Sequence, residues 1–298
     1  MAGISFAVCA LLTWAYHVRP DWAAALTLFP AWAWLFLSSL LCFSLRRRPG
    51  QIGLGCWLVF ALLHVEEPRS LLRSLLPAPA PHSLRIATVN ATGSFLAIAD
   101  ALKEAPDIVL VQESPAPAQW AGFLETHPDY QLLTGLDASI LTKGSIELHH
   151  HGRFYTIARV HLHGQTFGVG SLRLATSDPR IDLWNPQCWR DQTGIRQKQL
   201  SQIWEVRSQL PASLPIILGG DFNVPQRDRV FTRLTERLND SFSGAARGWC
   251  NTITTDFPML RIDQIWTSRE LQSVNTYTKK SAHTDHRIYV ADFKFSAP

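Results

Sequence analysis

Cysteine is scarce in this sequence of 298 residues, with five in all, and no two of them have the Cys-x-x-Cys spacing of a zinc site. Cys9, Cys42 and Cys56 lie in the apolar N-terminal part, which leaves Cys188 and Cys250 as a pair that an oxidising compartment would allow to form a disulfide. The sequence does not place their Cα atoms, so a bridge between them stays open. The cysteines therefore give no indication of a metal centre.

Charged side chains are sparse over the first 65 residues, where Trp, Leu, Ala and Phe fill much of the chain. Such a composition is typical of membrane segments. We predict three membrane spans, which are Ala2–Tyr16, Ala23–Leu45 and Gln51–Val65. The middle one is long enough to cross the ~30 Å hydrocarbon layer, which takes about 20 residues of helix, and its Pro30 is tolerated in lipid. The outer two are shorter, so two spans instead of three are the alternative.

The few charges in this part bear on its orientation. No basic residue precedes Arg19, so the first segment lacks the positively charged start of a cleaved secretory signal. Arg46 to Arg48 should stay in the cytoplasm by the positive-inside rule. Three spans in the inner (cell) membrane then place the chain after about Glu66 outside the cytoplasm, whereas two would leave it inside. A buried helical hairpin in a soluble protein is the alternative to membrane insertion.

Proline is concentrated just after the apolar part, where the run Leu76–Pro81 favours extended, semi-rigid chain. We therefore predict a membrane segment over residues 1–65, a Pro-rich spacer over 66–82 and a soluble domain over 83–298. The formal net charge is only +4, and Arg46 to Arg48 contribute three of these charges. This mild balance does not indicate a nucleic-acid partner.

The soluble part contains neither an internal repeat nor a low-complexity tract, and short apolar runs alternate with polar turns. The strands that we predict are Leu84–Asn90, Ile108–Gln112, Ser139–Thr142, Phe154–Leu162, Thr166–Leu174, Ile216–Gly219, Arg261–Trp266 and Ile288–Phe295. The helices that we predict are Ser94–Ala105, Pro117–His127, Arg190–Leu210 and Asp228–Arg237. This order indicates an α+β fold, a two-sheet β-sandwich flanked by helices.

Asp221 and Asn223 follow a buried strand that ends in two glycines. The glycines let the backbone turn sharply, and alternation along extended chain puts the two polar side chains on one face. A carboxylate and an amide at a sheet rim are able to activate water and hold a phosphate oxygen. An ordinary turn that favours Asp and Asn is the alternative.

Asp285 and His286 occupy the last loop before the strand that starts at Ile288. Adjacent residues point opposite ways in extended chain, so one is free to bind a metal while the other meets a different partner. Asp263 is the expected partner of His286, because a carboxylate on one ring nitrogen stabilises the imidazolium. Taken alone, the Asp-His pair is also compatible with an ordinary surface loop.

Glu113 and Asn90 each lie at the end of a predicted strand. Hard oxygen ligands in such places suit Mg²⁺, which prefers one or two carboxylates together with water and substrate oxygens. For Glu113 a charge that merely ends the strand is the alternative. The whole set indicates a metal-assisted phosphoryl site.

The order of these motifs resembles that of the endonuclease/exonuclease/phosphatase superfamily, which has the DNase-I-like fold. The motifs that carry the resemblance are Ile86–Asn90, Asp107–Glu113, Gly219–Asn223, Arg261–Trp266 and His283–Arg287. The resemblance runs from about Leu84 to Phe295. It implies a divalent-metal-dependent hydrolase with Mg²⁺ as the metal, or Mn²⁺ as the alternative.

The resemblance also implies a role for each residue. Glu113 would bind the metal, with Asn90 beside it, and Asp285 would be a metal or water-orienting ligand. Asp221 would orient or deprotonate the attacking water, and Asn223 would hold the phosphate. His286, paired with Asp263, would face the scissile phosphate.

Two positions depart from the family pattern. Arg173 stands where the family commonly has His or Tyr, and it is able to neutralise phosphate oxygens but not to act as an acid or base. His161 on the preceding strand is a substitute that we consider, although a partly buried structural role is the simpler interpretation. Thr284 replaces the usual Ser before Asp-His and keeps the hydroxyl.

Further polar residues have simpler interpretations. Arg196 and Gln199 share one helix face, which we interpret as a solvated face, with anchoring of that helix near the site as the alternative. We interpret His149 to His151 as a polar turn between strands, because three adjacent imidazoles cannot all reach one ion.

We therefore predict a membrane-tethered phosphoric ester hydrolase whose substrate is a lipid-linked phosphate. This resembles the membrane-anchored members of the superfamily associated with teicoplanin resistance. One alternative is a nuclease outside the cytoplasm, which would need a basic groove where the sequence offers only scattered cations such as Arg227, Arg229 and Arg233. The other is an inactive phospholipid-binding or scaffold protein, for which the change at Arg173 is the only motive.

Overall fold

The computed structural model describes residues 2–43, 48–77, 79, 81–176, 185–225 and 228–295. The α-helices are α1 (Ala2–Val18), α2 (Ala24–Thr27), α3 (Ala31–Phe43), α4 (Arg48–His64), α5 (Glu67–Arg73), α6 (Phe95–Leu102), α7 (Trp120–Glu125), α8 (Pro186–Ser208) and α9 (Thr232–Thr235). Short 3₁₀ helices are η1 (Asp21–Ala23), η2 (Pro117–Gln119) and η3 (Arg229–Phe231). The strands are β1 (Leu84–Asn90), β2 (Ile108–Gln112), β3 (Gln131–Leu133), β4 (Ala138–Thr142), β5 (Ser145–His151), β6 (Tyr155–Leu162), β7 (Gln165–Arg173), β8 (Ile216–Asp221), β9 (Asn239–Asp240), β10 (Asp263–Thr267), β11 (Leu271–Lys279) and β12 (Ile288–Phe295).

The strands form two six-stranded sheets, in the orders β11-β12-β1-β2-β4-β3 and β5-β6-β7-β8-β10-β9. Each sheet has one parallel pair at its centre, β1 with β2 and β7 with β8, and the neighbouring pairs are antiparallel. Strands β1 and β2 consist mostly of apolar and β-branched residues, as expected for strands that are covered on both faces. This topology brings the carboxyl ends of the two parallel pairs to the same edge as the amino ends of β10 and β12.

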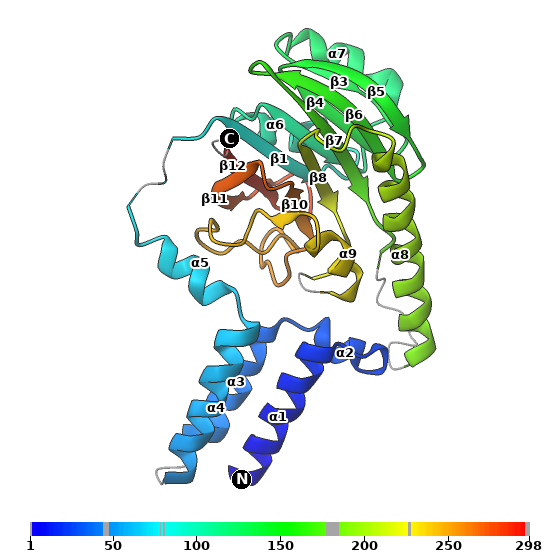
Figure 1. Cartoon of the computed structure of the whole chain (residues 1–298). Coiled ribbons are helices and arrows are strands. Elements are labelled where there is room, and N and C mark those ends of the chain that lie inside the picture. The colour runs from blue at the N-terminus through cyan, green and yellow to red at the C-terminus, as the bar shows by residue number, and fades with distance from the viewer. Residues whose placement is uncertain are drawn as a thin grey trace.

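The two sheets pack face to face, and helices cover their outer faces (Figure 1). Leu84 and Ile108 from one sheet meet Val160 and Ile217 from the other in the central layer of the core. Helices α6 and α7 pack on the outer face of the first sheet, and α8, η3 and α9 pack on that of the second. The predicted α+β sandwich with flanking helices is therefore confirmed.

Local sequence located most of the domain's elements. Strands β1 and β2 have the predicted bounds, whereas β3, β5, β9 and β11 were not predicted. The interpretation of His149 to His151 as a turn was wrong, because all three residues lie in β5. That strand is an edge strand with largely exposed side chains, so it lacks the apolar alternation that marks a half-buried strand.

The N-terminal helices α1, α3 and α4 lie side by side below the sandwich (Figure 1). Their mutual contacts bury Leu12 and Tyr16 of α1 against Trp57 and Phe60 of α4. The prediction of one continuous span over Ala23–Leu45 was wrong, since the chain forms η1 and α2, breaks before Pro30 and restarts as α3. Proline has no N–H to donate to the preceding turn and is favoured where a helix begins.

None of the helices in the described part of the chain has both the length and the apolar character needed to cross a membrane.

The segment predicted as an extended spacer starts as helix α5. Within it Glu67 and Ser70 are buried, because α5 lies against the loop that precedes β10. The first half of this segment is therefore part of a folded contact between the N-terminal helices and the sandwich, not a free spacer.

Candidate active site

Most of the predicted site residues lie together at the sheet edge described above. Asn90 and Asp221 end β1 and β8, Glu113 follows β2, Arg173 ends β7, Asp263 begins β10 and His286 precedes β12. Asp221 is the direct cross-strand partner of both Arg173 and Asp263. Strand register therefore assembles the three charged side chains of the second sheet, and the packing of the first sheet against it adds Asn90, whose Nδ2 donates to Asp221.

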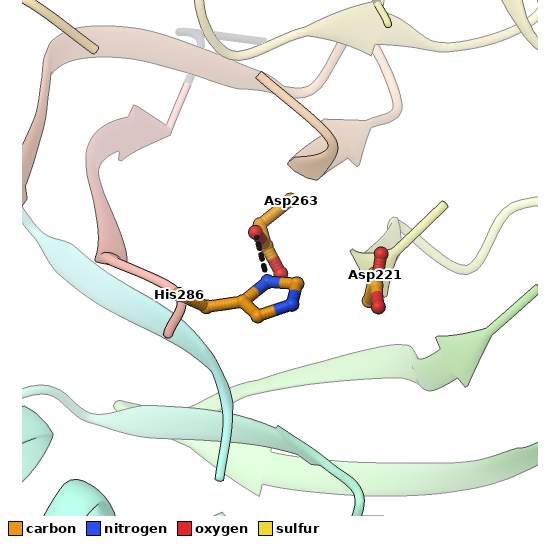
Figure 2. A group of neighbouring side chains, drawn as sticks. All are labelled: Asp221, Asp263 and His286. Atoms are coloured by element: carbon orange, nitrogen blue, oxygen red, sulfur yellow. Dashed lines mark hydrogen bonds and ion pairs between the residues drawn. The ribbon is translucent and has the colours of Figure 1, made fainter. Parts of the chain in front are cut away.

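His286 and Asp263 form the innermost ion pair of the site. The ring Nδ1 of His286 lies 2.8 Å from Oδ2 of Asp263, and both side chains are buried. Figure 2 shows the second ring nitrogen on the side that faces Asp221. Burial alone would lower the pKa of His286, but the Asp263 carboxylate beside it raises that pKa to about 10. His286 is therefore an imidazolium at neutral pH and is able to donate a proton or a hydrogen bond from Nε2.

Asp221 is the buried carboxylate opposite this pair. Burial, followed by the negative charge of Asp263, raises the pKa of Asp221 to about 7. Its Oδ2 accepts hydrogen bonds from Asn90 Nδ2 at 3.1 Å and from Asn223 Nδ2 at 3.0 Å. Its Oδ1 accepts from the backbone N–H of Asn223 at 2.9 Å. A carboxyl held on both oxygens and poised near neutral pH suits a base that positions water.

The two asparagines fix the carboxylates around them. Asn90 Nδ2 donates to Glu113 Oε1 at 3.0 Å as well as to Asp221, while its Oδ1 accepts from the backbone N–H of Thr92. Asn223 Nδ2 also donates to the carbonyl oxygen of Leu174 at 2.9 Å. In this arrangement both amides act as donors that join neighbouring strands, and their direct contact with metal or phosphate stays a prediction.

Arg173 lies among three carboxylates at the mouth of the site. Its Nη2 is 2.8 Å from Glu113 Oε1, its Nη1 is 3.4 Å from Asp137 Oδ2 and its Nε is 4.0 Å from Asp221 Oδ2. Burial alone would lower the pKa of Arg173, but the three carboxylates outweigh this effect and raise the pKa above its ordinary value. The guanidinium is therefore always charged. Asp137 was not predicted, although it precedes the apolar strand β4 just as other site residues adjoin strands.

The backbone at this edge takes conformations that most side chains avoid. Glu113 has φ 45° and Asn223 has φ 55°, both in the left-handed region. Gly220 has φ 145°, and a Cβ atom there would run into the carbonyl oxygen of Leu172. Strained backbone of this kind persists where the surrounding structure fixes it and is concentrated at functional sites.

The donor set fits a divalent cation. Glu113, Asp137, Asp221 and Asp263 are carboxylates, whereas only Arg173 and the buried imidazolium bring positive charge, so these residues together are short of positive charge. Side-chain atoms of Asp221, Asp263 and His286 lie within 4.8 Å of one another, and of these the two carboxylates are the groups able to bind a cation while His286 is protonated. The second carboxylate oxygen of Asp263, Oδ1, is buried and has no hydrogen-bond partner among the described residues. Hard oxygen ligands with excess negative charge are what Mg²⁺ and Mn²⁺ require.

Asp285 and Thr284 frame the site on the side of β12. Asp285 is 66% exposed, and its Oδ1 lies 4.0 Å from His286 Nε2. The hydroxyl of Thr284 donates to the carbonyl oxygen of Asn90 at 2.8 Å and accepts from the backbone N–H of His286 at 3.2 Å. The hydroxyl kept by Thr284 thus joins the first and the last strand of this sheet edge.

Other sequence predictions have plain outcomes. His161 is exposed at the far end of β6, so it does not replace Arg173, and its predicted partial burial was wrong. Arg196 is buried, and its Nη1 donates to the Ala175 carbonyl oxygen, while the Gln199 amide oxygen accepts from the Ala175 N–H. These two side chains therefore anchor α8 next to the site, and their interpretation as a solvated helix face was wrong. Cys188 and Cys250 do not form a disulfide with each other.

The model of the Endonuclease/Exonuclease/phosphatase family matches residues 87–286 of this sequence. The matched range contains all the residues of the site, and the chain therefore belongs to that family. No curated protein matches the sequence.

Solved structures of similar fold are numerous. One is an endonuclease/exonuclease/phosphatase from Beutenbergia cavernae, with 16% identity and a TM-score of 0.56 over 73% of this chain and 72% of that one. A second, from Bacteroides vulgatus, has 15% identity and a TM-score of 0.55 over 72% and 99%. A third is D. rerio TDP2 complexed with single-strand DNA product, with 19% identity and a TM-score of 0.52 over 71% and 98%. At these identities the likeness shows the fold alone.

The charge of His286 should persist well above neutral pH. A group whose pKa rises on folding stabilises the protein fully below its unfolded value, here 6.5, and that contribution is lost as the pH rises through about 10. Asp263→Asn should therefore reduce the free energy of unfolding more at pH 6 than at about pH 10.5. A ¹⁵N NMR titration of the imidazole measures the pKa directly, and a midpoint near 6.5 in the unmodified protein would contradict this account.

Proposed function

We propose that this protein is a divalent-metal-dependent phosphoric ester hydrolase that is held at a membrane and acts on a lipid-linked phosphate. The observation that carries the proposal is the buried group of Asp221, Asp263 and His286, built on one sheet edge with Glu113 and Asn90 beside it. This group has a base, an imidazolium and an excess of negative charge for a metal. Burial of charged groups costs free energy, and groups perturbed in this way are concentrated at functional sites. The buried charges therefore favour an enzyme over an inactive scaffold.

The side chains divide the reaction among them. Glu113 would hold Mg²⁺ or Mn²⁺, with Asp285 as a second candidate ligand; when bound, the metal supplies Lewis-acid polarisation of a phosphoryl oxygen. Asp221 orients the attacking water and accepts its proton. His286, kept charged by Asp263, donates from Nε2 to the developing charge on the phosphate or leaving group, and Arg173 neutralises a further phosphate oxygen.

Membrane attachment is proposed from the surface of the N-terminal helices. Large apolar side chains are exposed on α1, α3 and α4, namely Ile4, Phe6, Leu11, Trp14, Val18, Phe36, Ile52, Leu54, Leu58, Val59, Leu62 and Leu63. Exposed apolar patches of this extent are typical of surfaces that contact a membrane or a partner. We propose the bilayer as the occupant, with the sandwich outside the cytoplasm according to the Arg46–Arg48 orientation.

A lipid-linked substrate follows from where the site lies relative to these helices. The loop residue Thr255 donates its N–H to the carbonyl oxygen of Asp285, and Phe257 of the same loop contacts Trp32 of α3. On the other flank, α8 lies against η1 and carries Arg196 and Gln199 next to the site. Two elements, the loop that holds Thr255 and helix α8, therefore connect the site with the N-terminal helices, which supports phosphates presented at a bilayer as the substrates.

Phosphate release tests this proposal. The detergent-solubilised full-length protein should hydrolyse a polyprenyl diphosphate or a phospholipid with Mg²⁺, lose at least about 100-fold of that rate in EDTA, and regain it with added Mg²⁺ or Mn²⁺. Single-stranded DNA serves as the parallel substrate.

The comparison between substrates decides the class. Hydrolysis of DNA alone, with a steep dependence on salt, would replace the proposal by a nuclease. EDTA-insensitive hydrolysis would contradict the role of the metal, and lack of turnover of every substrate would favour a binding protein.

A further inference from the structure

The loop between β9 and β10 is in contact with both the N-terminal helices and the candidate active site. We call residues 246–261 the bridging loop. Its first part is bonded to α5, since the backbone N–H of Gly248 donates to the carbonyl oxygen of Ser70 at 3.0 Å and Asn251 Nδ2 donates to Glu67 Oε1 at 2.9 Å. Asn251 and Glu67 are both buried, so this bond is shielded from water.

The tip of the bridging loop is bonded to α3. Trp32 Nε1 donates to the carbonyl oxygen of Met259 at 3.3 Å. The Trp32 ring also packs edge-on against Trp249 and Phe257, with centroids 5.4 Å and 6.4 Å apart. A single aromatic side chain of the N-terminal helices, that of Trp32, thus contacts the loop at Trp249, Phe257 and Met259.

The opposite face of the bridging loop holds the Asp263–His286 pair. The hydroxyl of Thr252 accepts the backbone N–H groups of Ile262 and Asp263, at 3.1 Å and 3.2 Å. The N–H of Arg287 donates to the carbonyl oxygen of Thr252 at 2.8 Å, and Ile253 forms a bridge with His286. The loop therefore contacts the backbone on both sides of the ion pair.

We propose that Trp32 and Asn251 are positioning residues, and that the N-terminal helices hold the Asp263–His286 pair in its working geometry through the bridging loop. The helices would then be a part of the active site's support and not only an anchor. This inference uses the proposed hydrolase activity for its kinetic test, but its structural test is independent of any substrate. A tether without this role would need no buried bonds to the loop that lies against the site.

Trp32→Ala in the full-length protein is the main test. We expect kcat for bis(4-nitrophenyl) phosphate with Mg²⁺ to fall on the order of 10-fold with little change in KM, because small displacements of reacting groups are costly while the substrate contacts are retained. Hydrogen exchange should accelerate about 10-fold or more at the amides of Thr255 and Arg287, which bond across the loop. The amides of β2 should keep their protection, which would show that the sandwich stays folded.

The matched control is Trp14→Ala, an exposed tryptophan of α1 that packs on Trp22 and not on the loop. It should leave both kcat and the exchange at Thr255 unchanged. Asn251→Leu should reproduce the effect of Trp32→Ala, and Trp32→Phe should restore part of the rate by keeping ring contacts. Unchanged exchange at Thr255 and Arg287 in a folded Trp32→Ala protein would overturn the inference.

The two readouts separate this inference from the proposed function. If the unmodified protein hydrolyses nothing but exchange still responds to Trp32→Ala, the coupling stands and the hydrolase proposal fails. If hydrolysis is normal and exchange and kcat are indifferent to Trp32→Ala, the hydrolase proposal stands and the coupling fails.

Discussion

Asp221→Asn is expected to reduce kcat by about 10³-fold, the range typical for loss of a general base. The substitution keeps the size of the side chain but removes the charge that orients water. It also places an NH₂ group among the donors that now bond to the carboxylate, which are Asn90 Nδ2, Asn223 Nδ2 and the Asn223 N–H. Steady-state kinetics with bis(4-nitrophenyl) phosphate and Mg²⁺ measures the loss.

The control for this prediction is Asp129→Asn, which changes an exposed carboxylate in the turn between α7 and β3. Its kcat should stay within about two-fold of the unmodified protein, as expected for a surface substitution outside the site. The thermal midpoint of Asp221→Asn should not fall in proportion to its activity, because burial already disfavours the charged form of Asp221. Retention of most of the activity in a folded Asp221→Asn protein would remove Asp221 from the reaction.

Arg261→Leu is expected to lower the free energy of unfolding by about 3–5 kcal/mol, the usual cost of breaking a buried ion pair. Arg261 is 1% exposed, and its Nη2 lies 2.7 Å from Asp240 Oδ2 and 3.4 Å from Glu66 Oε2. Its guanidinium also lies 4.4 Å from the centroid of the Phe242 ring. Without the cation, Asp240 would be left as a buried charge with its main partner gone.

Urea unfolding of the single and double variants measures this effect. Asp240→Asn combined with Arg261→Leu should recover part of the lost stability, because the double variant also removes the charge of Asp240 that lost its main partner. A single variant within about 1 kcal/mol of the unmodified protein would show that water reaches Asp240. Equal losses in the single and the double variant would assign the effect to packing around Phe242 instead.

The sequence predicted the sandwich well where burial alone decides local structure. Strands β1 and β2 are rich in apolar and β-branched residues and are buried almost throughout, and β12 is buried over its first six residues; the bounds of all three were predicted. Strand β11, with the sequence Leu-Gln-Ser-Val-Asn-Thr-Tyr-Thr-Lys, was missed because it is a mostly half-exposed edge strand with few apolar residues. Its position is fixed by pairing with β12, which no local pattern shows.

The site was predictable to the extent that its residues adjoin buried strands. Asp221, Glu113 and His286 each adjoin such a strand; strand pairing places each one at an edge of its own sheet, and the packing of the two sheets then brings them together. The position of Arg173 among Glu113, Asp137 and Asp221 could not be predicted, because it depends on the side-chain conformation in the folded protein. The contact of Trp32 with Met259 joins residues too far apart in sequence for any periodicity to show.

The pairing of β1 with β12 has a consequence for how the protein folds during its synthesis on the ribosome. Asn90 comes from the first strand of the domain and His286 from the start of the last, and these strands are neighbours in one sheet. Until β12 emerges, β1 lacks its partner on that side, and the imidazolium is absent from the site. A chain that stops before β12 would therefore be both inert and left with an open sheet edge, and neither defect is repaired until the last strand of the domain has been made.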